Sequence, residues 1–244
     1  MSPAQPDVGS PLVAVVIPAH DEAGRVGRVL DKLPRDGLFE AIVVDDGSSD
    51  GTADEARAHG ADVVLRWSTR RGVGAAIRAG WSCGIERGRP YLALIAGDDQ
   101  HEPSELVGAF DALRTAGADY VQGSRRLHDG LTPGAWRSRR IANVLYAWAF
   151  SALARRRVSD ASNGFRIFRS SLLSDPAIDL SQGWLDGYEL EPYLLYKAVR
   201  RHRVIEQPAT VSFLEVQPAT KLRAVYSWCR LIRPVVLLAT GVRR

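Results

Sequence analysis

The sequence contains little cysteine, little lysine and no long apolar run. Its two cysteines, Cys83 and Cys229, lie far apart and form no C-x-x-C pair, which favours a reducing compartment and argues against a zinc knuckle. No apolar run approaches the roughly 18 residues that a membrane-spanning helix needs. Residues 1–10 lack the charged and apolar regions of a signal peptide, and we expect them to be disordered. These absences predict a cytoplasmic protein.

The positive charge of the chain comes almost wholly from arginine. The 32 Lys+Arg residues face 28 Asp+Glu residues, which gives a net charge of +4, and only three of the basic residues are lysines. A planar guanidinium binds phosphate through two parallel N–H donors, so the arginines indicate a phosphate-bearing partner. Codon bias would give the same composition. The basic residues are scattered, which argues against a nucleic-acid partner. With 244 residues, we expect one large domain or two small ones.

The first half of the chain alternates apolar segments that suit buried strands with segments of helical period. The expected strands are 12–17, 41–44, 61–65, 91–95 and 119–122, and the expected helices are 21–33, 52–59, 74–84 and 103–116. This alternation predicts an open, mostly parallel α/β sheet flanked by helices. Ligands of such sheets bind at the carboxyl ends of the strands.

The second half lacks this alternation. We expect helices at 141–154 and 186–201, short strands at 204–206 and 210–213, and a polar loop at 159–166. The segment 222–244 has the pattern of an amphipathic basic helix, which is typical of packed C-terminal helices and also of helices that lie on anionic membranes. We therefore expect a single domain over 11–221, with halves 11–125 and 126–221, followed by this helix.

A dinucleotide-binding pattern is missing. Such a sheet needs G-x-G-x-x-G directly after its first strand, whereas the only G-x-G here is Gly72-Val73-Gly74, after the third expected strand. A Walker A loop is missing as well. The sequence therefore argues against a nicotinamide-dependent dehydrogenase.

Acidic pairs follow three of the expected strands instead. Asp21-Glu22, Asp45-Asp46 and Asp98-Asp99 come after the first, second and fourth strands. Because the carboxyl ends of parallel strands meet at one edge of a sheet, we expect these carboxylates to converge. Clustered carboxylates at such an edge bind nucleoside hydroxyls, or hold Mg²⁺ or Mn²⁺ against a diphosphate.

These acids belong to segments that resemble the motifs of inverting family-two glycosyltransferases. V-I-P-A-H-D-E at 16–22 resembles the first motif, and V-V-D-D-G-S-S-D-G-T at 43–52 resembles the second very closely. G-V-G-A-A at 72–76 is similar to the glycine-rich segment, and A-G-D-D-Q-H-E-P at 96–103 stands where the family has D-x-D-x-Q-H-x-P. Q-G-S-R at 122–125 and D-A-S-N-G-F-R at 160–166 are most similar to the dolichyl- and polyprenyl-phosphate mannosyl- and glucosyltransferase branch. The resemblance covers about residues 13–221.

The resemblance implies a GT-A fold, which is a Rossmann-like single domain, and a Mg²⁺ or Mn²⁺ cofactor. It further implies that the protein moves a hexose, with inversion, from a UDP- or GDP-linked donor to a polyprenyl phosphate at the inner face of the plasma membrane. Two alternatives stay open. One is the same donor with a soluble hydroxyl acceptor, and the other is a non-catalytic nucleotide-sugar binder.

The resemblance also assigns site residues by motif position. The nucleotide-sugar residues are Pro18, His20, Glu22, Asp45, Asp46, Gly74, Arg78 and Asp98. The acceptor or phosphate residues are Arg125, Arg137 and Lys221, the metal ligands are Asp98 and Gln100, and the catalytic residues are Asp98, Asp160 and Glu189, with Asp186 as a further candidate base. An ionised phosphate nucleophile needs only to be positioned, whereas a hydroxyl nucleophile needs a general base.

The sequence departs from the family pattern at two positions. Ala96 replaces the first Asp of D-x-D, so we expect metal binding to be weaker, and the neighbouring Asp99 should point the other way at a strand end. Arg70 stands where the family often has Asn, and it either contacts a phosphate or faces water. We expect His101 to have a capping or packing role.

Overall fold

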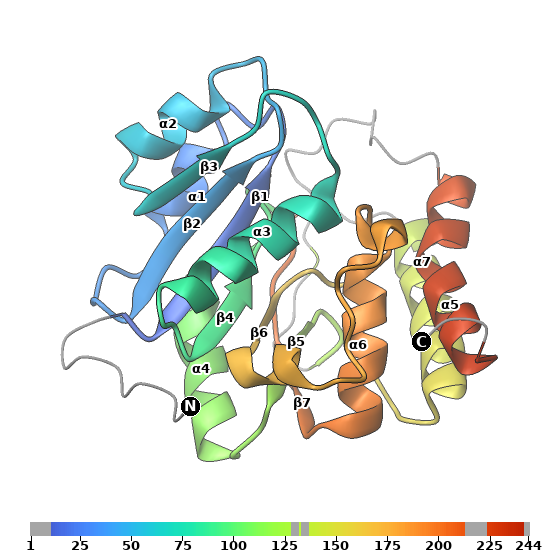
Figure 1. Cartoon of the computed structure of the whole chain (residues 1–244). Coiled ribbons are helices and arrows are strands. Elements are labelled where there is room, and N and C mark those ends of the chain that lie inside the picture. Colours follow the sequence, from blue (N-terminus) through green and yellow to red (C-terminus); the bar gives the residue numbers. More distant parts are fainter. Residues whose placement is uncertain (1–10, 128–131, 133–136, 213–223, 242–244) are drawn as a thin grey trace.

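A seven-stranded sheet organises the described part of the chain. The computed structural model describes residues 11–127, 132, 137–212 and 224–241. Its strands are β1 (Val13–Ala19), β2 (Phe39–Asp45), β3 (Val63–Arg66), β4 (Tyr91–Leu94), β5 (Tyr120–Ser124), β6 (Arg166–Arg169) and β7 (Val204–Pro208), in the order β3-β2-β1-β4-β6-β5-β7. Only the two pairings made by β6 are antiparallel. The predicted mostly parallel α/β sheet is confirmed (Figure 1).

Helices cover both faces of the sheet. They are α1 (Val26–Asp31), α2 (Thr52–Ala58), α3 (Val73–Glu86), α4 (Glu105–Thr115), α5 (Arg137–Ala154), α6 (Leu190–Arg201) and α7 (Ala224–Ala239), together with the 3₁₀ turns Ser170–Ser174 and Gly183–Leu185. Because successive strand residues alternate between faces, Val13 and Val15 of β1 share a core with α1, α2 and α4. Ala14 and Val16 share the other core with α3, α5, α6 and α7. None of the described helices is long and apolar enough to cross a bilayer.

Two glycines let α3 lie directly on β1. A Cβ on Gly80 would overlap the Val16 side chain, and a Cβ on Gly84 would lie 2.6 Å from the Ala14 Cβ. Larger residues at these helix positions would push α3 away from the sheet. The close contact fixes the first turn of α3 beside the carboxyl ends of the central strands.

The predicted helix over 21–33 and the predicted helix over 186–201 both begin too early. Asp21 and Gly24 have φ values of 54° and 79°, which interrupt a right-handed helix, and α1 starts only at Val26. The backbone carbonyl of Asp186 accepts hydrogen bonds from the first turn of α3, so α6 starts only at Leu190.

The sequence analysis missed β6 and predicted a strand at 210–213 that the described residues of this segment do not form. β6 has only four residues, with arginine at both ends, and it lies antiparallel between β4 and β5 inside an otherwise parallel sheet. Within the described part of the predicted 210–213 strand, Val211 makes only an isolated bridge to His101. The predicted segment 1–10 lies outside the described residues, and the proposed division of the chain at residues 125 and 221 stays a prediction.

Candidate active site

A cavity of about 180 Å³ lies at the carboxyl ends of β1 and β4, beside the first turn of α3. Its lining includes five of the residues that the resemblance assigned to the nucleotide sugar, which are Pro18, His20, Glu22, Asp46 and Asp98. These residues come from three different strand ends. The expected convergence of acidic residues at one edge of the sheet is therefore found in the structure.

Asp46 joins the end of β2 to the segment that precedes α3. Its Oδ1 accepts the Arg71 backbone N–H at 2.6 Å, and its Oδ2 accepts the Gly72 N–H at 2.9 Å. His20 Nδ1 lies 2.8 Å from the Asp46 carbonyl oxygen, so this ring nitrogen carries the hydrogen and donates it. Arg70 also lines the cavity, with its Nε 3.9 Å from the Asp46 carboxylate. Asp46 thus holds the wall of the cavity in place.

Asp45 is fully buried and does not line the cavity. Its Oδ1 accepts the Ser48 N–H at 2.8 Å, which closes the turn after β2. Its Oδ2 lies 3.4 Å from Arg66 Nε and makes no hydrogen bond within the described residues. Asp45 therefore shapes the turn, and its predicted contact with the nucleotide sugar stays a prediction.

Asp98 and Asp99 have different surroundings. Asp98 lines the cavity and accepts hydrogen bonds from the Gln100 backbone N–H at 3.2 Å and from Gln100 Nε2 at 2.6 Å. Burial raises the pKa of the Asp98 carboxyl above its ordinary value, and the Gln100 backbone donor offsets only part of this effect. Asp99 instead accepts hydrogen bonds from Arg28 Nε and Lys32 Nζ, each at 2.8 Å. The expectation that Asp99 points away from Asp98 is confirmed.

The donor set around Asp98 fits a divalent cation that is held together with a diphosphate. The Asp98 carboxylate is a ligand that Mg²⁺ accepts, and Mg²⁺ commonly takes its other ligands from substrate phosphates and water. Gln100 is hydrogen-bonded to Asp98 through Nε2 but is not among the lining residues, so its predicted contact with the metal stays a prediction. Ala96 lines the same cavity and contributes no side-chain oxygen. Within the described residues, no group of three or more Asp, Glu, His and Cys side chains could hold an ion on its own.

Gly74 and Arg78 lie on α3 but do not line the cavity. A Cβ on Gly74 would overlap the backbone oxygen of Leu185, and the Gly74 N–H donates to the Asp186 carbonyl at 2.8 Å. Arg78 donates to the Leu180 carbonyl at 2.7 Å and pairs with the Asp186 carboxylate. Both residues therefore hold the segment 180–187 against α3, and their predicted contact with the donor stays a prediction.

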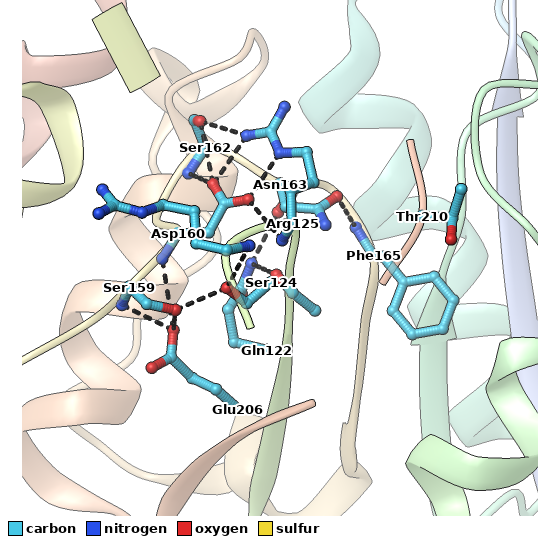
Figure 2. A network of polar contacts seen from close by, with 12 residues as sticks. Gln122, Ser124, Arg125, Ser159, Asp160, Ser162, Asn163, Phe165, Glu206 and Thr210 are labelled. Carbon is cyan, nitrogen blue, oxygen red and sulfur yellow. Dashed lines mark hydrogen bonds and ion pairs between the residues drawn. The ribbon is translucent and has the colours of Figure 1, made fainter. Parts of the chain in front are cut away.

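Arg125 and Asp160 point toward one another at the end of β5 (Figure 2). Arg125 Nε donates to Asp160 Oδ2 at 2.6 Å and Nη2 donates to Oδ1 at 2.7 Å, while the Arg125 backbone N–H donates to Oδ2 at 3.1 Å. Burial alone would raise the pKa of Asp160, but the Arg125 guanidinium outweighs it, and the pKa is lowered. Asp160 is therefore a stable carboxylate, which makes it a weak proton acceptor.

The loop that carries Asp160 is fastened to β5 and β7. The Ser159 N–H and Oγ both donate to Glu206 Oε1 at 2.7 Å, and Ser159 Oγ lies 2.6 Å from Ser124 Oγ (Figure 2). Gln122 Nε2 donates to the Asn163 carbonyl at 2.8 Å. The position of Arg125 and Asp160 is thus set by contacts from two strands.

His101 packs as a neutral side chain between the cavity and this loop. Its Nδ1 accepts the Ala96 N–H at 3.0 Å, so Nε2 carries the hydrogen and donates to Asn163 Oδ1 at 3.1 Å. Burial, reinforced by the nearby Arg125, lowers the pKa of His101 to about 4. His101 also lines the cavity, and its hydrogen bonds agree with the expected capping or packing role.

The sequence analysis missed a second ion pair, which joins a buried arginine to a half-buried glutamate of the cavity wall. Arg166 is 1% exposed, and its Nη2 donates to Glu191 Oε2 at 2.5 Å and to the Asn163 carbonyl at 2.9 Å. Glu191 lines the cavity at the start of α6. The arginine that ends the segment 160–166 was a visible signal, but nothing in the sequence identified its partner 25 residues later.

The remaining predicted residues lie away from the cavity or outside the described part. Glu189 is buried just before α6 and is not among the lining residues, although its neighbour Glu191 is. Arg137 is the exposed first residue of α5. Lys221 lies outside the described residues. The roles assigned to these three residues stay predictions.

Comparison with known proteins places this arrangement among sugar-transferring enzymes. The profile of the family described as glycosyl transferase family 2 matches residues 14–178. The chain is 34% identical over 209 residues to undecaprenyl-phosphate mannosyltransferase of Micrococcus luteus, an alignment that covers 81% of this chain and 82% of that protein. It is also 34% identical over 217 residues to polyprenol monophosphomannose synthase of Mycolicibacterium smegmatis, with 83% and 78% covered.

A solved structure shares the fold. Glucosyl-3-phosphoglycerate synthase from Mycobacterium tuberculosis, crystallised with Mn²⁺, UDP and glucosyl-3-phosphoglycerate, superposes with a TM-score of 0.69 at 21% identity, over 96% of this chain and 81% of that one. At this identity the likeness supports the fold alone. The expected α/β fold of the GT-A type is confirmed.

Proposed function

The chain belongs to glycosyl transferase family 2 and is a glycosyltransferase, and we propose that it transfers a hexose from a UDP- or GDP-linked donor to a polyprenyl phosphate with inversion. The observation that carries this proposal is the cavity at the strand ends, in which carboxylates from the segments after β2 and β4 face one space. Two relatives that are each 34% identical are named for transfer to, or synthesis of, such lipid phosphates.

The donor's nucleoside would occupy the part of the cavity lined by Pro18, His20, Glu22 and Asp46. The carboxylates accept hydrogen bonds from ribose hydroxyls or from a base N–H, and His20 is oriented by its bond to the Asp46 carbonyl. Asp45 would act indirectly by holding the turn that follows Asp46. Arg70, on the same wall, would contact a donor phosphate.

Asp98 and Gln100 would hold the divalent cation. When bound, Mg²⁺ or Mn²⁺ neutralises charge that develops on the departing nucleoside diphosphate. With Ala96 in place of a second carboxylate, more of this neutralisation falls to cations of the chain, and Arg70 is the cavity-lining residue that can supply it.

The state of the candidate bases favours a phosphate acceptor over a hydroxyl acceptor. Asp160 is paired with Arg125, Asp186 is paired with Arg78, and Glu189 does not line the cavity. A phosphate oxygen is already ionised, so it attacks the anomeric carbon without losing a proton, while the bond from that carbon to the diphosphate breaks and the electron pair leaves with the nucleoside diphosphate. In-line attack of this kind inverts the anomeric centre. The acceptor is a membrane lipid, so the reaction would take place at the inner face of the plasma membrane.

Two neighbouring carboxylates provide the test. The protein is incubated with UDP- and GDP-hexoses, Mg²⁺ or Mn²⁺ and a short-chain polyprenyl phosphate, and the product is quantified by mass spectrometry. Asp98→Asn should reduce transfer on the order of 100-fold, because it removes the carboxylate that faces the diphosphate. Asp99→Asn is the matched control and should retain transfer, since Asp99 pairs with Arg28 and Lys32, and Asn tolerates its positive φ.

The proposed function fails if the wild-type protein transfers no hexose to the polyprenyl phosphate. The role of Asp98 fails if both variants lose transfer equally or if neither does. Stabilisation of the native protein by nucleotide sugars with no transfer to any acceptor would instead identify a non-catalytic binder.

A further inference from the structure

The outer face of α5 is an exposed apolar stripe. Ile141, Leu145 and Trp148 are 60%, 64% and 75% exposed, and these are the three most exposed large hydrophobic side chains among the described residues. Their spacing of four and three residues places them on one side of the helix, and the exposed Ala152 continues the row. We call these four residues the α5 stripe. Single exposed hydrophobic residues are common on protein surfaces, but an aligned row that includes tryptophan indicates a contact surface.

The opposite face of α5 anchors the helix to the rest of the protein. Tyr146 and Phe150 are buried in the core that α5 shares with α6 and α7, and the Phe150 ring makes an edge contact with Tyr196 of α6 at 6.4 Å. The stripe is therefore on the side of α5 that faces away from the core. From Ile141 to Ala152 it extends about 16 Å along a rigid element.

Arginines flank the stripe at both ends. Arg137 and Arg140 are exposed at its beginning, and the exposed run 155–157, which is three arginines, follows its end. The sequence contains no Asp or Glu from residue 130 to residue 159. The surface around the stripe therefore combines apolar side chains with positive charge and has no nearby acidic residue in sequence to neutralise it.

This combination fits an anionic lipid surface better than a second copy of the chain. Tryptophan and arginine are suited to the headgroup layer, where an apolar body meets phosphate groups. Antiparallel pairing of two α5 stripes would bring the arginines at the start of one helix next to those at the end of the other, and like charges facing each other are unfavourable. Four side chains on one helix also provide much less area than the roughly 800 Å² per partner of a standard interface.

The placement of α5 agrees with such a contact. Figure 1 shows α5 and α7 side by side at the end of the molecule opposite α2. The helix α6, against which α5 packs, carries Glu191 of the cavity wall. A membrane bound through α5 would thus lie near the end of the sheet that is formed by β5 and β7 and covered by α6.

We propose that the α5 stripe docks on the headgroup layer of an anionic membrane, with Trp148 inserted at the interface and the flanking arginines on lipid phosphates. The choice of a lipid occupant rests partly on the proposed function, because a polyprenyl phosphate acceptor lies in a membrane. The amphipathic segment 222–244 is the less suitable candidate, since Val236, at 39%, is the only exposed large hydrophobic residue among the described side chains of α7.

Vesicle binding by the full chain tests this proposal. Sedimentation is measured with phosphatidylcholine vesicles and with vesicles that contain one third phosphatidylglycerol. The wild-type protein should bind the anionic vesicles, and binding should weaken with salt. Trp148→Ser should weaken binding about tenfold or more. The triple variant Arg155→Gln, Arg156→Gln and Arg157→Gln should weaken it about 100-fold. Val107→Ser is the matched control, because Val107 is 37% exposed on α4, which packs on the other face of the sheet.

Three outcomes would overturn the proposal. The wild-type protein fails to bind anionic vesicles, or Trp148→Ser and Val107→Ser reduce binding equally, or the protein is a dimer that Trp148→Ser dissociates while vesicle binding is unchanged. A thermal melt of each variant confirms that it is folded.

The test separates docking from catalysis. Vesicle binding needs neither donor nor acceptor, and transfer to a short-chain acceptor needs no vesicle. Binding without transfer would therefore contradict the proposed function alone. Transfer in solution without vesicle binding would contradict the docking surface alone.

Discussion

Two regions at the same edge of the sheet use charged side chains in opposite ways. At the ends of β2 and β4, the carboxylates of Asp46 and Asp98 face a cavity and accept hydrogen bonds from backbone and side-chain amides. Beyond the end of β5, the Asp160 carboxylate holds a buried arginine, Arg125, through two side-chain hydrogen bonds. The carboxylates of the first region line the cavity, whereas the carboxylate of the second is neutralised by an arginine within the protein.

The difference shows that a motif residue with reactive chemistry need not line the cavity. Asp160 and Arg125 belong to segments that resemble family motifs as clearly as the one with Asp98 does, yet each satisfies the other. Their geometry suits a positioning role, in which the ion pair holds the loop 159–163 next to the cavity. Arg166 also suits a positioning role, because its guanidinium is paired with Glu191.

The largest expected effect comes from breaking the ion pair between Arg125 and Asp160. Asp160→Ala leaves the Arg125 guanidinium, 7% exposed, without its counter-ion, and we expect it to lower the free energy of unfolding by about 3–5 kcal/mol. Urea denaturation measures the loss. In the exposed pair of Arg57 and Asp54, the matched change Asp54→Ala should cost less than about 1 kcal/mol. Equal losses of unfolding free energy in the two variants would show that the buried ion pair contributes no more to stability than the exposed one.

The second effect is a pH dependence that originates in His101. Because burial lowers its pKa to about 4 in the folded state, the unfolded chain binds more protons between pH 4 and about 6.5, and the stability due to this group is lost as pH falls through that window. The wild-type protein should lose about 3 kcal/mol more than His101→Gln between pH 7 and pH 4.

The surface histidine His59 is the control for this pH dependence. A hydrogen bond to Asp31 raises the pKa of His59, so its contribution is present at low pH and disappears as pH rises. His59→Gln should therefore leave the loss of stability below pH 6.5 in place. Identical pH profiles for wild-type protein and His101→Gln would contradict the buried neutral state of His101.

The smallest expected effect is a change in metal affinity at the cavity. Ala96→Asp restores a second carboxylate to the cavity, and we expect Mn²⁺ in the presence of UDP or GDP to bind about tenfold more tightly, because ligand charge sets affinity at such sites. The Mn²⁺ dependence of thermal stability measures it. Ala58→Asp, at the exposed end of α2, is the control and should leave it unchanged. If Ala96→Asp leaves the Mn²⁺ dependence of thermal stability unchanged, the cation binds away from residue 96.

The parallel strands and their acidic ends could be predicted from the sequence because both are local features. An apolar run followed by Asp45-Asp46 or Asp98-Asp99 indicates a buried strand and its carboxyl end without knowledge of the rest of the chain. Adjacent residues at a strand end point in different directions, so the separate surroundings of Asp98 and Asp99 also followed from the pattern.

The second region could not be predicted because its features depend on distant residues. The partners Arg125 and Asp160 are 35 residues apart, and only the fold brings them together. The strand β6 is too short and too charged to be recognised by its period. The apolar stretch 141–154 predicted a helix correctly. Its composition could not show that Trp148 is exposed, because apolar residues at helical spacing look the same in a sequence whether they face the core or an external partner.

The most direct test of the central claim is a comparison of two matched acceptors. A polyprenyl phosphate and the polyprenol with the same chain are offered with an α-linked nucleotide hexose, and the products are resolved by NMR. The account predicts a β-linked hexosyl phosphate from the lipid phosphate and no glycoside from the alcohol. Transfer to the alcohol alone, or a product that keeps the α configuration, would contradict it.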